Sequence, residues 1–212
     1  MRELMLGPRR FSDLRTSLPG ISANVLTQRL EGLETAGVLV RRKLPPPAGS
    51  QVYELTGWGY ESEPIFQALG RWAARSPAHD PTLPFSAASF LLSLRTMLDP
   101  QQAEGVDARI GLRIGAESYL AHLASGRIEI AVGAPDGADL VLTGSPPMLA
   151  GAIYGGQALH ALEAIGAVRV EGDRALAERF VTLFPLPPKA ERPEVDALLS
   201  LQPSLNFQPP SA

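Results

Sequence analysis

The chain has 212 residues, of which 45% are hydrophobic and 19% charged, a composition typical of a globular protein with one large domain or two small ones. It contains no cysteine, which excludes disulfides, thiolate metal sites and thiol catalysis, and its three histidines show no metal-ligand spacing. No apolar run approaches the roughly 18 residues of a membrane helix, and the start MRELMLGPRR lacks the apolar centre of a signal peptide. We therefore expect a cytoplasmic protein without a membrane span.

The charge is distributed unevenly along the chain. Residues 1–76 hold ten Lys and Arg against seven Asp and Glu, a balance of +3, whereas residues 77–212 hold nine against fifteen, a balance of −6. Basic residues of the first part lie before the first predicted helix, at Arg9 and Arg10, and again in a predicted hairpin. This asymmetry predicts two domains with different partners.

Residues 12–37 predict two helices joined by a tight turn. The first helix covers Ser12–Leu18, and Pro19-Gly20 forms the turn. Ser22 is a good N-cap for the second helix, and Gly37 is suited to a left-handed C-terminal cap. The second helix carries one apolar stripe with the spacing i, i+4, i+7, formed by Leu26, Leu30 and Leu33.

A basic hairpin follows the two helices. Residues 39–44 and 51–55 are rich in strand-forming side chains, and Pro45–Pro47 belong at the tip because proline cannot donate to a ladder. Helix, turn, helix and basic hairpin is the order of a winged helix-turn-helix, which reads the major groove of duplex DNA.

The polar face of the second helix predicts the DNA contacts. Asn and Gln pair bidentately with adenine, while Ser and Thr contact bases or phosphate. Alternatively, this face is an ordinary solvated surface, and the basic strand is an edge that prevents aggregation. The combination of turn and hairpin favours the DNA interpretation. The predicted DNA-binding residues are Ser22, Asn24, Thr27, Gln28, Arg29, Arg41, Arg42 and Lys43.

A further helix, capped by Thr56, is expected over about residues 57–75. It contains many large apolar side chains, namely Trp58, Ile65, Phe66, Leu69 and Trp72. Such a helix either forms a dimer or packs against its own domain, and the sequence supports both interpretations.

The stretch RELMLGPRRFSDLRTSLPGISANVLTQRLEGLETAGVLVRRKLPPPAGSQVYELTGWG closely resembles the HxlR-type transcriptional regulators, over about residues 2–76. The resemblance implies a homodimer on a palindromic operator, with residues 23–36 in the major groove and residues 41–53 as the wing. Family members usually carry a further helix before the RELM segment, and they tend to have Val or Ile where Met1 stands. We therefore expect that the chain is N-terminally shortened and that the gene starts upstream. Some members sense oxidants or aldehydes through a cysteine in that segment, a mode that does not carry over.

The second half predicts an α+β domain. Residues 77–84 form a proline-rich linker, and the tail of residues 191–212 is expected to be irregular or disordered. Ser125-Gly126 predicts a hairpin turn. Strands are expected at 108–114, 118–124, 126–132, 138–144 and 167–173. Helices are expected at 85–98, at 146–154 after the N-cap Ser145, at 159–164, and from the N-cap Asp173 to Phe184.

The segments ADLVLTGSPPMLAGAIYGG and GAVRVEGDRALAERFVTLFP resemble the sterol carrier protein type-two family. The resemblance covers about residues 85–186 of a predicted domain at 85–190. The resemblance implies a mainly antiparallel sheet covered by helices, with an apolar cavity suited to acyl chains or sterols. The predicted ligand-binding residues are Met148, Ile153, Tyr154, Phe180 and Phe184, although each is also expected of a plain core.

No enzyme motif is recognised, so we predict no catalytic residue, cofactor or metal. Gly155-Gly156, for example, lacks the strand, loop and Lys or Ser/Thr context of a phosphate loop. The first hypothesis is a transcriptional regulator that binds double-stranded operator DNA as a homodimer and responds to an apolar small-molecule or lipid effector. The alternative is a lipid-binding or carrier protein with a degenerate DNA-binding domain. Salt dependence discriminates between them, because binding through several phosphate contacts weakens steeply with salt.

Overall fold

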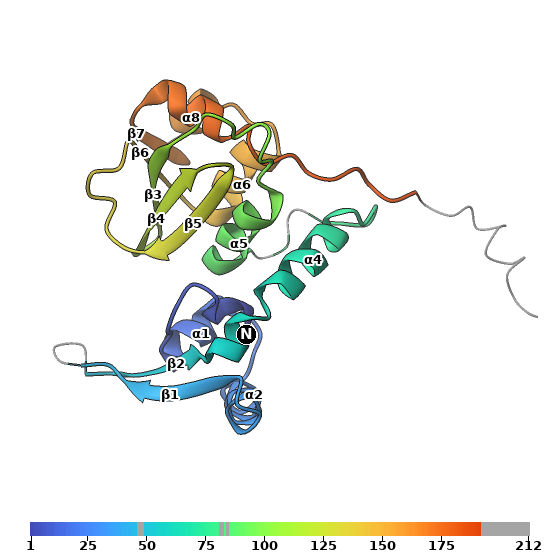
Figure 1. The fold of residues 1–212 in the computed structure, drawn as a ribbon, viewed down its shortest axis with the longest axis vertical. Coiled ribbons are helices and arrows are strands. Elements are labelled where there is room, and N and C mark those ends of the chain that lie inside the picture. Colours follow the sequence, from blue (N-terminus) through green and yellow to red (C-terminus); the bar gives the residue numbers. More distant parts are fainter. Residues whose placement is uncertain (46–48, 81–82, 84, 192–212) are drawn as a thin grey trace, which may run out of the picture.

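The computed structural model describes residues 1–45, 49–80, 83 and 85–191, and Figure 1 shows its two parts. We call residues 1–76 the winged-helix region and residues 85–190 the sheet region. The winged-helix region contains the 3-10 helix η1 (Arg2–Leu4), α1 (Phe11–Ser17), α2 (Ala23–Thr35), β1 (Leu39–Lys43), β2 (Gln51–Leu55), α3 (Gly57–Tyr60) and α4 (Glu63–Ala74). The sheet region contains α5 (Ala87–Met97), β3 (Ala108–Ile114), β4 (Glu117–Ala124), β5 (Arg127–Val132), β6 (Leu140–Gly144), α6 (Pro146–Tyr154), α7 (Leu159–Ala164), β7 (Val168–Gly172) and α8 (Arg174–Phe180). The predicted α+β class is confirmed.

Helix α2 begins and ends as its sequence predicts. The Ser22 hydroxyl accepts a hydrogen bond from the amide of Val25 at 3.3 Å. Gly37 has a φ of +73°, and the following amide, that of Val38, donates to the carbonyl of Leu33 at 2.9 Å. This left-handed ending satisfies carbonyls that the helix would otherwise leave open. The leucine stripe between the two caps faces the core of the winged-helix region.

The wing is a two-stranded hairpin with a third backbone segment beside it. Strand β1 pairs antiparallel with β2, so that Leu39 lies opposite Leu55. On the other side of β2, Arg9 forms a bridge with Tyr53: the amide of Arg9 donates at 2.9 Å and its carbonyl accepts at 2.8 Å. The predicted hairpin is confirmed, while residues 46–48 of its predicted tip lie outside the described residues.

The prediction of a single helix over residues 57–75 is wrong, because the chain forms two helices there. Thr56 caps the short α3 by accepting from the amide of Gly59 at 3.1 Å. The chain then turns, and α4 starts with Pro64 in its first turn. In one continuous helix the ring of Pro64 would clash with the carbonyl four residues earlier and remove a hydrogen bond, whereas a first turn tolerates it.

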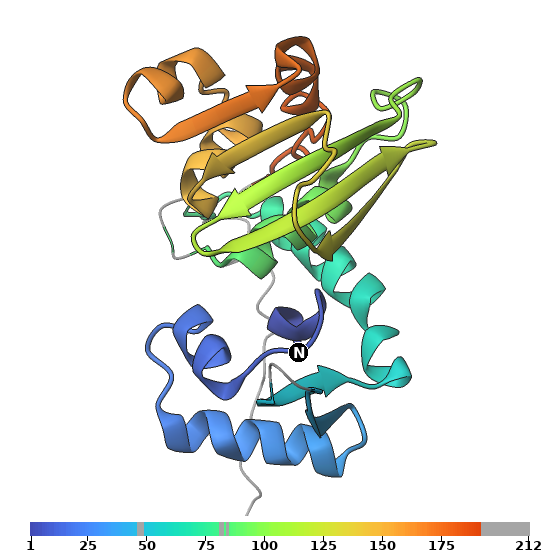
Figure 2. The same ribbon diagram turned by 90° about the vertical axis from the view of Figure 1, so that its left-hand side faces the viewer.

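The sheet has five strands in the order β5-β4-β3-β6-β7. Only β3 and β6 pair in parallel, so the predicted mainly antiparallel sheet is confirmed. Ser125 and Gly126 have φ values of +52° and +69°, which form the predicted tight hairpin turn between β4 and β5. Seen in Figure 2, the helices of the sheet region lie behind the sheet.

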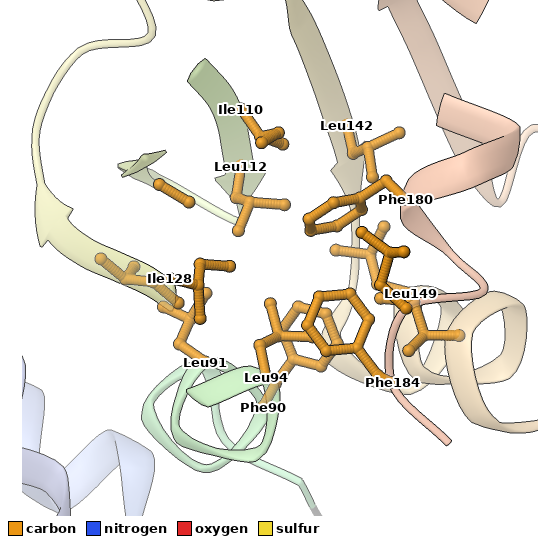
Figure 3. Close-up of a cluster of buried hydrophobic side chains, with 14 of the residues drawn as sticks. Phe90, Leu91, Leu94, Ile110, Leu112, Ile128, Leu142, Leu149, Phe180 and Phe184 are labelled. Atoms are coloured by element: carbon orange, nitrogen blue, oxygen red, sulfur yellow. The ribbon is translucent and has the colours of Figure 1, made fainter. Parts of the chain in front are cut away.

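A large apolar core fills the space between the sheet and these helices. Phe90, Phe180 and Phe184 are almost fully buried in it, and the last two rings meet edge to face at 5.0 Å (Figure 3). Helix α8 was predicted to reach Phe184 but ends at Phe180. Pro185 disfavours helical backbone at Phe184, and the chain turns so that the second ring packs against the first.

A second, smaller core lies in the winged-helix region. It is formed around Leu14, Leu26, Leu30 and Leu39, and Leu92 of α5 also joins it. Conversely, Leu6 of the winged-helix region packs in the sheet-region core. The division at residues 76 and 85 stays a prediction, as does the linker, of which residues 81, 82 and 84 lie outside the described residues. The same holds for the predicted tail, described only at residue 191.

Candidate DNA interface

Helix α2 presents its predicted recognition face to solvent. It forms the end of the molecule farthest from the sheet region (Figure 2). The predicted contact residues of this helix and its cap are all exposed: Ser22, Asn24, Thr27, Gln28 and Arg29. Their helix buries Leu26 and Leu30 on the opposite side, so its orientation is fixed by the core. The polar side chains are therefore held on a rigid surface that is free to enter a groove.

Arg41 of the wing is paired within the chain. Its Nε donates to Oε2 of Glu34 in α2 at 2.8 Å, and its guanidinium lies 5.8 Å from the centre of the Tyr53 ring. The hydrogen bond from Arg41 lowers the pKa of Glu34, and the same bond raises the pKa of Arg41. The pair links the wing to α2 and partly neutralises a predicted phosphate contact.

Arg42 is also paired, whereas Lys43 is not. Nε of Arg42 donates to the carboxylate of Glu54 on β2, and this bond raises the pKa of Arg42. Lys43 is exposed, and none of the ion pairs between described residues involves it. Of the three predicted wing cations, Lys43 is therefore the one whose charge is fully available to phosphate.

Two further arginines belong to the basic surface of this region. Arg10, beside the start of α1, and Arg15, in its last turn, are exposed and take no part in the ion pairs between described residues. Neither arginine is among the DNA contacts predicted from the sequence. The available signal was position, because the first helix of this motif crosses the DNA backbone.

Arg9 points away from this surface and joins the two regions. Its guanidinium donates to the carboxylate of Glu117 and, at 2.8 Å, to the hydroxyl of Tyr119. The same hydroxyl donates to Glu117 at 2.7 Å, and the side chain of Arg9 is only 11% exposed. Because its backbone pairs with Tyr53, Arg9 connects the wing directly to strand β4.

The predicted ligand-binding residues lie in and around the core of the sheet region. Ile153, Phe180 and Phe184 are buried, and Met148 is partly exposed. The hydroxyl of Tyr154 lies 2.7 Å from Oγ of Ser93, and burial raises the pKa of this tyrosine. A ligand role for these five residues stays a prediction.

Among the grooves on the described surface are two that are not lined by any of those five residues. The larger, of about 910 Å³, runs between α4, α5 and the edge strand β5. The smaller, of about 580 Å³, lies between the α1–α2 turn and the start of α6. Among the described residues, no cluster of His, Cys, Asp or Glu is placed to hold a metal ion. No helix in the described part of the chain is long and apolar enough to cross a membrane.

Comparison with known proteins identifies the first part of the chain. The sequence model of the HxlR-like helix-turn-helix family matches residues 1–80. These residues form an HxlR-like helix-turn-helix domain. The uncharacterized HTH-type transcriptional regulator YvaP of Bacillus subtilis is 37% identical over 71 residues, covering 34% of this chain and 66% of YvaP. The chain thus spans just under two thirds of that relative's length.

Solved structures give similar regions in both parts. The reduced form of the transcriptional regulator YodB from B. subtilis is 33% identical to the HxlR-like part, covering 37% of this chain and 78% of that one, with a TM-score of 0.33. Another similar structure is that of the ubiquinone synthesis protein UbiJ-SCP2. It is 18% identical, with a TM-score of 0.36, and the match covers 61% of this chain and 93% of that one.

Proposed function

We propose that this protein is an HxlR-type transcriptional regulator that binds double-stranded DNA through α2 and the wing. The observation that carries the proposal is the exposed polar face of α2, set beside a free wing cation in an HxlR-like domain. Asn24 and Gln28 are the side chains suited to adenine edges. Lys43, Arg10 and Arg15 are the cations suited to phosphates, which set position rather than sequence preference.

The proposed regulator acts as a homodimer through α4. One face of this helix exposes three large apolar side chains with the spacing i, i+4, i+7: Ile65 is 69% exposed, Leu69 55% and Trp72 72%. A contiguous exposed apolar stripe of this kind marks an interaction surface. A second copy of α4 would cover it with two-fold symmetry, which is the symmetry of a palindromic operator.

We further propose that an effector bound to the sheet region modulates DNA binding. An effector regulates only if it binds the DNA-competent and the incompetent state with different affinities. Two contacts are placed to transmit such a difference, namely the Arg9 network to β4 and the ion pair of Glu63 on α4 with Arg95 on α5.

The alternative function is a lipid-binding or carrier protein whose DNA-binding domain is degenerate. A specific observation favours it: Arg41 and Arg42, two of the eight predicted DNA contacts, are already paired with Glu34 and Glu54. These pairs lower the positive charge that the wing offers to phosphates. The two functions differ in affinity for DNA and in its salt dependence.

Fluorescence anisotropy of the full chain with labelled duplex DNA tests the proposal. The probe is the region upstream of its own gene, a scrambled duplex is the control, and each is titrated at two salt concentrations. Regulation requires binding that prefers the native duplex and weakens steeply with salt. Equally weak binding to both duplexes would refute it and favour the carrier interpretation.

A further inference from the structure

The larger groove brings both regions of the molecule together. It is lined by Glu63 and Gln67 of α4, by Arg95 of α5 and the adjoining Leu98, and by residues of the edge strand β5. In Figure 1, α4 approaches the sheet region beside α5. A volume of about 910 Å³ is within the range of small-molecule sites.

Two arginines line this groove, the exposed Arg127 of β5 and the largely buried Arg95 of α5, and the hydrogen bonding of Arg95 is incomplete. One terminal nitrogen donates to both carboxylate oxygens of Glu63, at 2.9 and 3.0 Å, and the other donates to the carbonyl of Ile130 at 2.5 Å. Its Nε is buried and has no partner among the described residues. The guanidinium is thus largely removed from water and is neutralised by a single carboxylate from another helix.

The surroundings of Arg95 define the chemistry that the groove recognises. A guanidinium binds a carboxylate through a planar fork of N–H donors, and it tolerates partial burial better than an ammonium. The groove is also lined by apolar side chains, among them Leu98 and the 60% exposed Val132, and by the charged side chains of Arg127 and Glu129 on β5. A ligand that matches both features has an anionic head group and an apolar body.

We propose that this groove binds a small amphipathic carboxylate whose head group replaces Glu63 on Arg95. Glu63 acts as an internal occupant, held in place also by Gln67 Nε2, which donates to it at 3.0 Å. Its displacement breaks the ion pair that ties α4 to α5, so the ligand acts on the helix that carries the apolar stripe. The regulatory meaning of the site rests on the proposed function, whereas the binding itself does not.

Isothermal titration calorimetry of the full chain tests the site with three probes, each below its aggregation concentration. Decanoate carries both the head group and the apolar body, decanol lacks the charge, and acetate lacks the chain. The proposal expects one decanoate per chain, and at least about tenfold weaker binding of decanol and acetate, because charge-assisted bonds contribute about that much. Equal binding of decanol and decanoate would overturn it.

Variants of the two partners of the ion pair should change the affinity for decanoate in opposite directions. Arg95→Gln removes the anchor and should weaken decanoate binding about tenfold or more. Glu63→Gln removes the competitor and should tighten binding by up to about fivefold, which is what a partly exposed ion pair contributes. Arg113→Gln is the matched control, because Arg113 forms a similar pair with Glu171 outside the groove, at 2.7 Å, and should leave binding unchanged.

The opposite changes in decanoate affinity distinguish an effect on the site from an effect on folding, because unfolding cannot make Glu63→Gln bind decanoate more tightly. Weaker binding of decanoate by both variants would overturn the displacement mechanism. Measuring DNA binding by fluorescence anisotropy with and without decanoate tests whether the occupied site changes the affinity for DNA. Binding with the expected signs but no change in DNA affinity supports the site and refutes only the proposed effector role.

Discussion

The two regions of this molecule place their candidate functional residues differently. In the winged-helix region the predicted contacts, such as Asn24 and Gln28, lie on the outside of a helix whose other face is buried. In the sheet region, predicted contacts such as Phe180 and Phe184 are part of the core. A surface that reads DNA is a local property of one helix, so its periodicity reveals it. A ligand site depends on how distant elements pack, and periodicity does not distinguish its lining from the core.

The regions also differ in how far they depend on each other. Arg9 and Glu63 both leave the winged-helix region to pair with residues of the sheet region. The buried Leu6 of the winged-helix region packs in the sheet-region core, and the buried Leu92 of the sheet region packs in the winged-helix core. The two regions therefore form an interface with each other through side chains of both cores.

The largest expected effect concerns the core of the sheet region. Phe180→Ala removes a fully buried ring that packs against Phe184, and should lower the free energy of unfolding by about 3–5 kcal/mol. Urea denaturation measures this loss. Leu186→Ala, at an exposed position, is the control. A loss under about 1 kcal/mol would show that Phe180 faces a space that can collapse or a ligand site rather than a packed core.

The apolar stripe of α4 gives the next effect. Leu69→Glu places a charge at the centre of the stripe and should convert the proposed dimer into a monomer. Affinity for the operator DNA should fall on the order of a hundredfold, because two linked DNA-binding domains bind far more tightly than one. Sedimentation velocity measures the oligomeric state. Ile165→Glu adds the same charge at another exposed apolar position, on the sheet region, and should leave the dimer intact.

The contact between the regions is tested at Arg9. Arg9→Ala removes the arginine bonds to Glu117 and to the buried Tyr119, which keep only the bond to each other, and should cost about 1.5–3 kcal/mol, as expected for hydrogen bonds to charged groups. Calorimetry should show one thermal transition in the parent and two in the variant. Arg10→Ala, at the exposed neighbour, is the control for stability. A single unchanged transition in Arg9→Ala would show that the apolar border alone couples the regions.

The recognition face is tested at Gln28. Gln28→Ala should relax the preference at one operator position and cost about 1–3 kcal/mol there, the contribution of one bidentate base contact. Binding to duplexes substituted one base pair at a time measures this change. An unaltered preference would mean that the face assigned to base reading is wrong. Glu31→Ala, on the same helix, should not change the preference.

The smallest effect separates the wing cations. Lys43→Ala should weaken binding to all duplexes about equally and reduce the salt slope by about one, as the loss of one phosphate contact does. Arg42→Ala should change the slope less, because Glu54 already neutralises Arg42. Anisotropy at several salt concentrations measures both slopes. Equal changes would show that Arg42 leaves Glu54 when DNA binds.

Local rules predicted much of this fold because local chemistry decides where most of its elements begin and end. Strands β2 and β3 and helices α6 and α7 have the predicted bounds, and the turn at Ser125-Gly126 is formed. The errors lie where a local pattern met a specific steric conflict. Pro64 divides the helix expected over residues 57–75. Pro185 disfavours the helical backbone that was expected up to Phe184, and α8 ends at Phe180.

The sequence by itself determined the HxlR-like resemblance, the capped recognition helix and the basic hairpin, because each depends on residues close together in the chain. Only the tertiary structure showed that Glu34 and Glu54 neutralise two wing arginines and that Arg9 reaches Tyr119. It also placed Arg95 beneath Glu63 in a groove. Ion pairs of this kind join separate elements, and their geometry is set by how the two cores pack together. No periodicity or spacing along the chain records that packing.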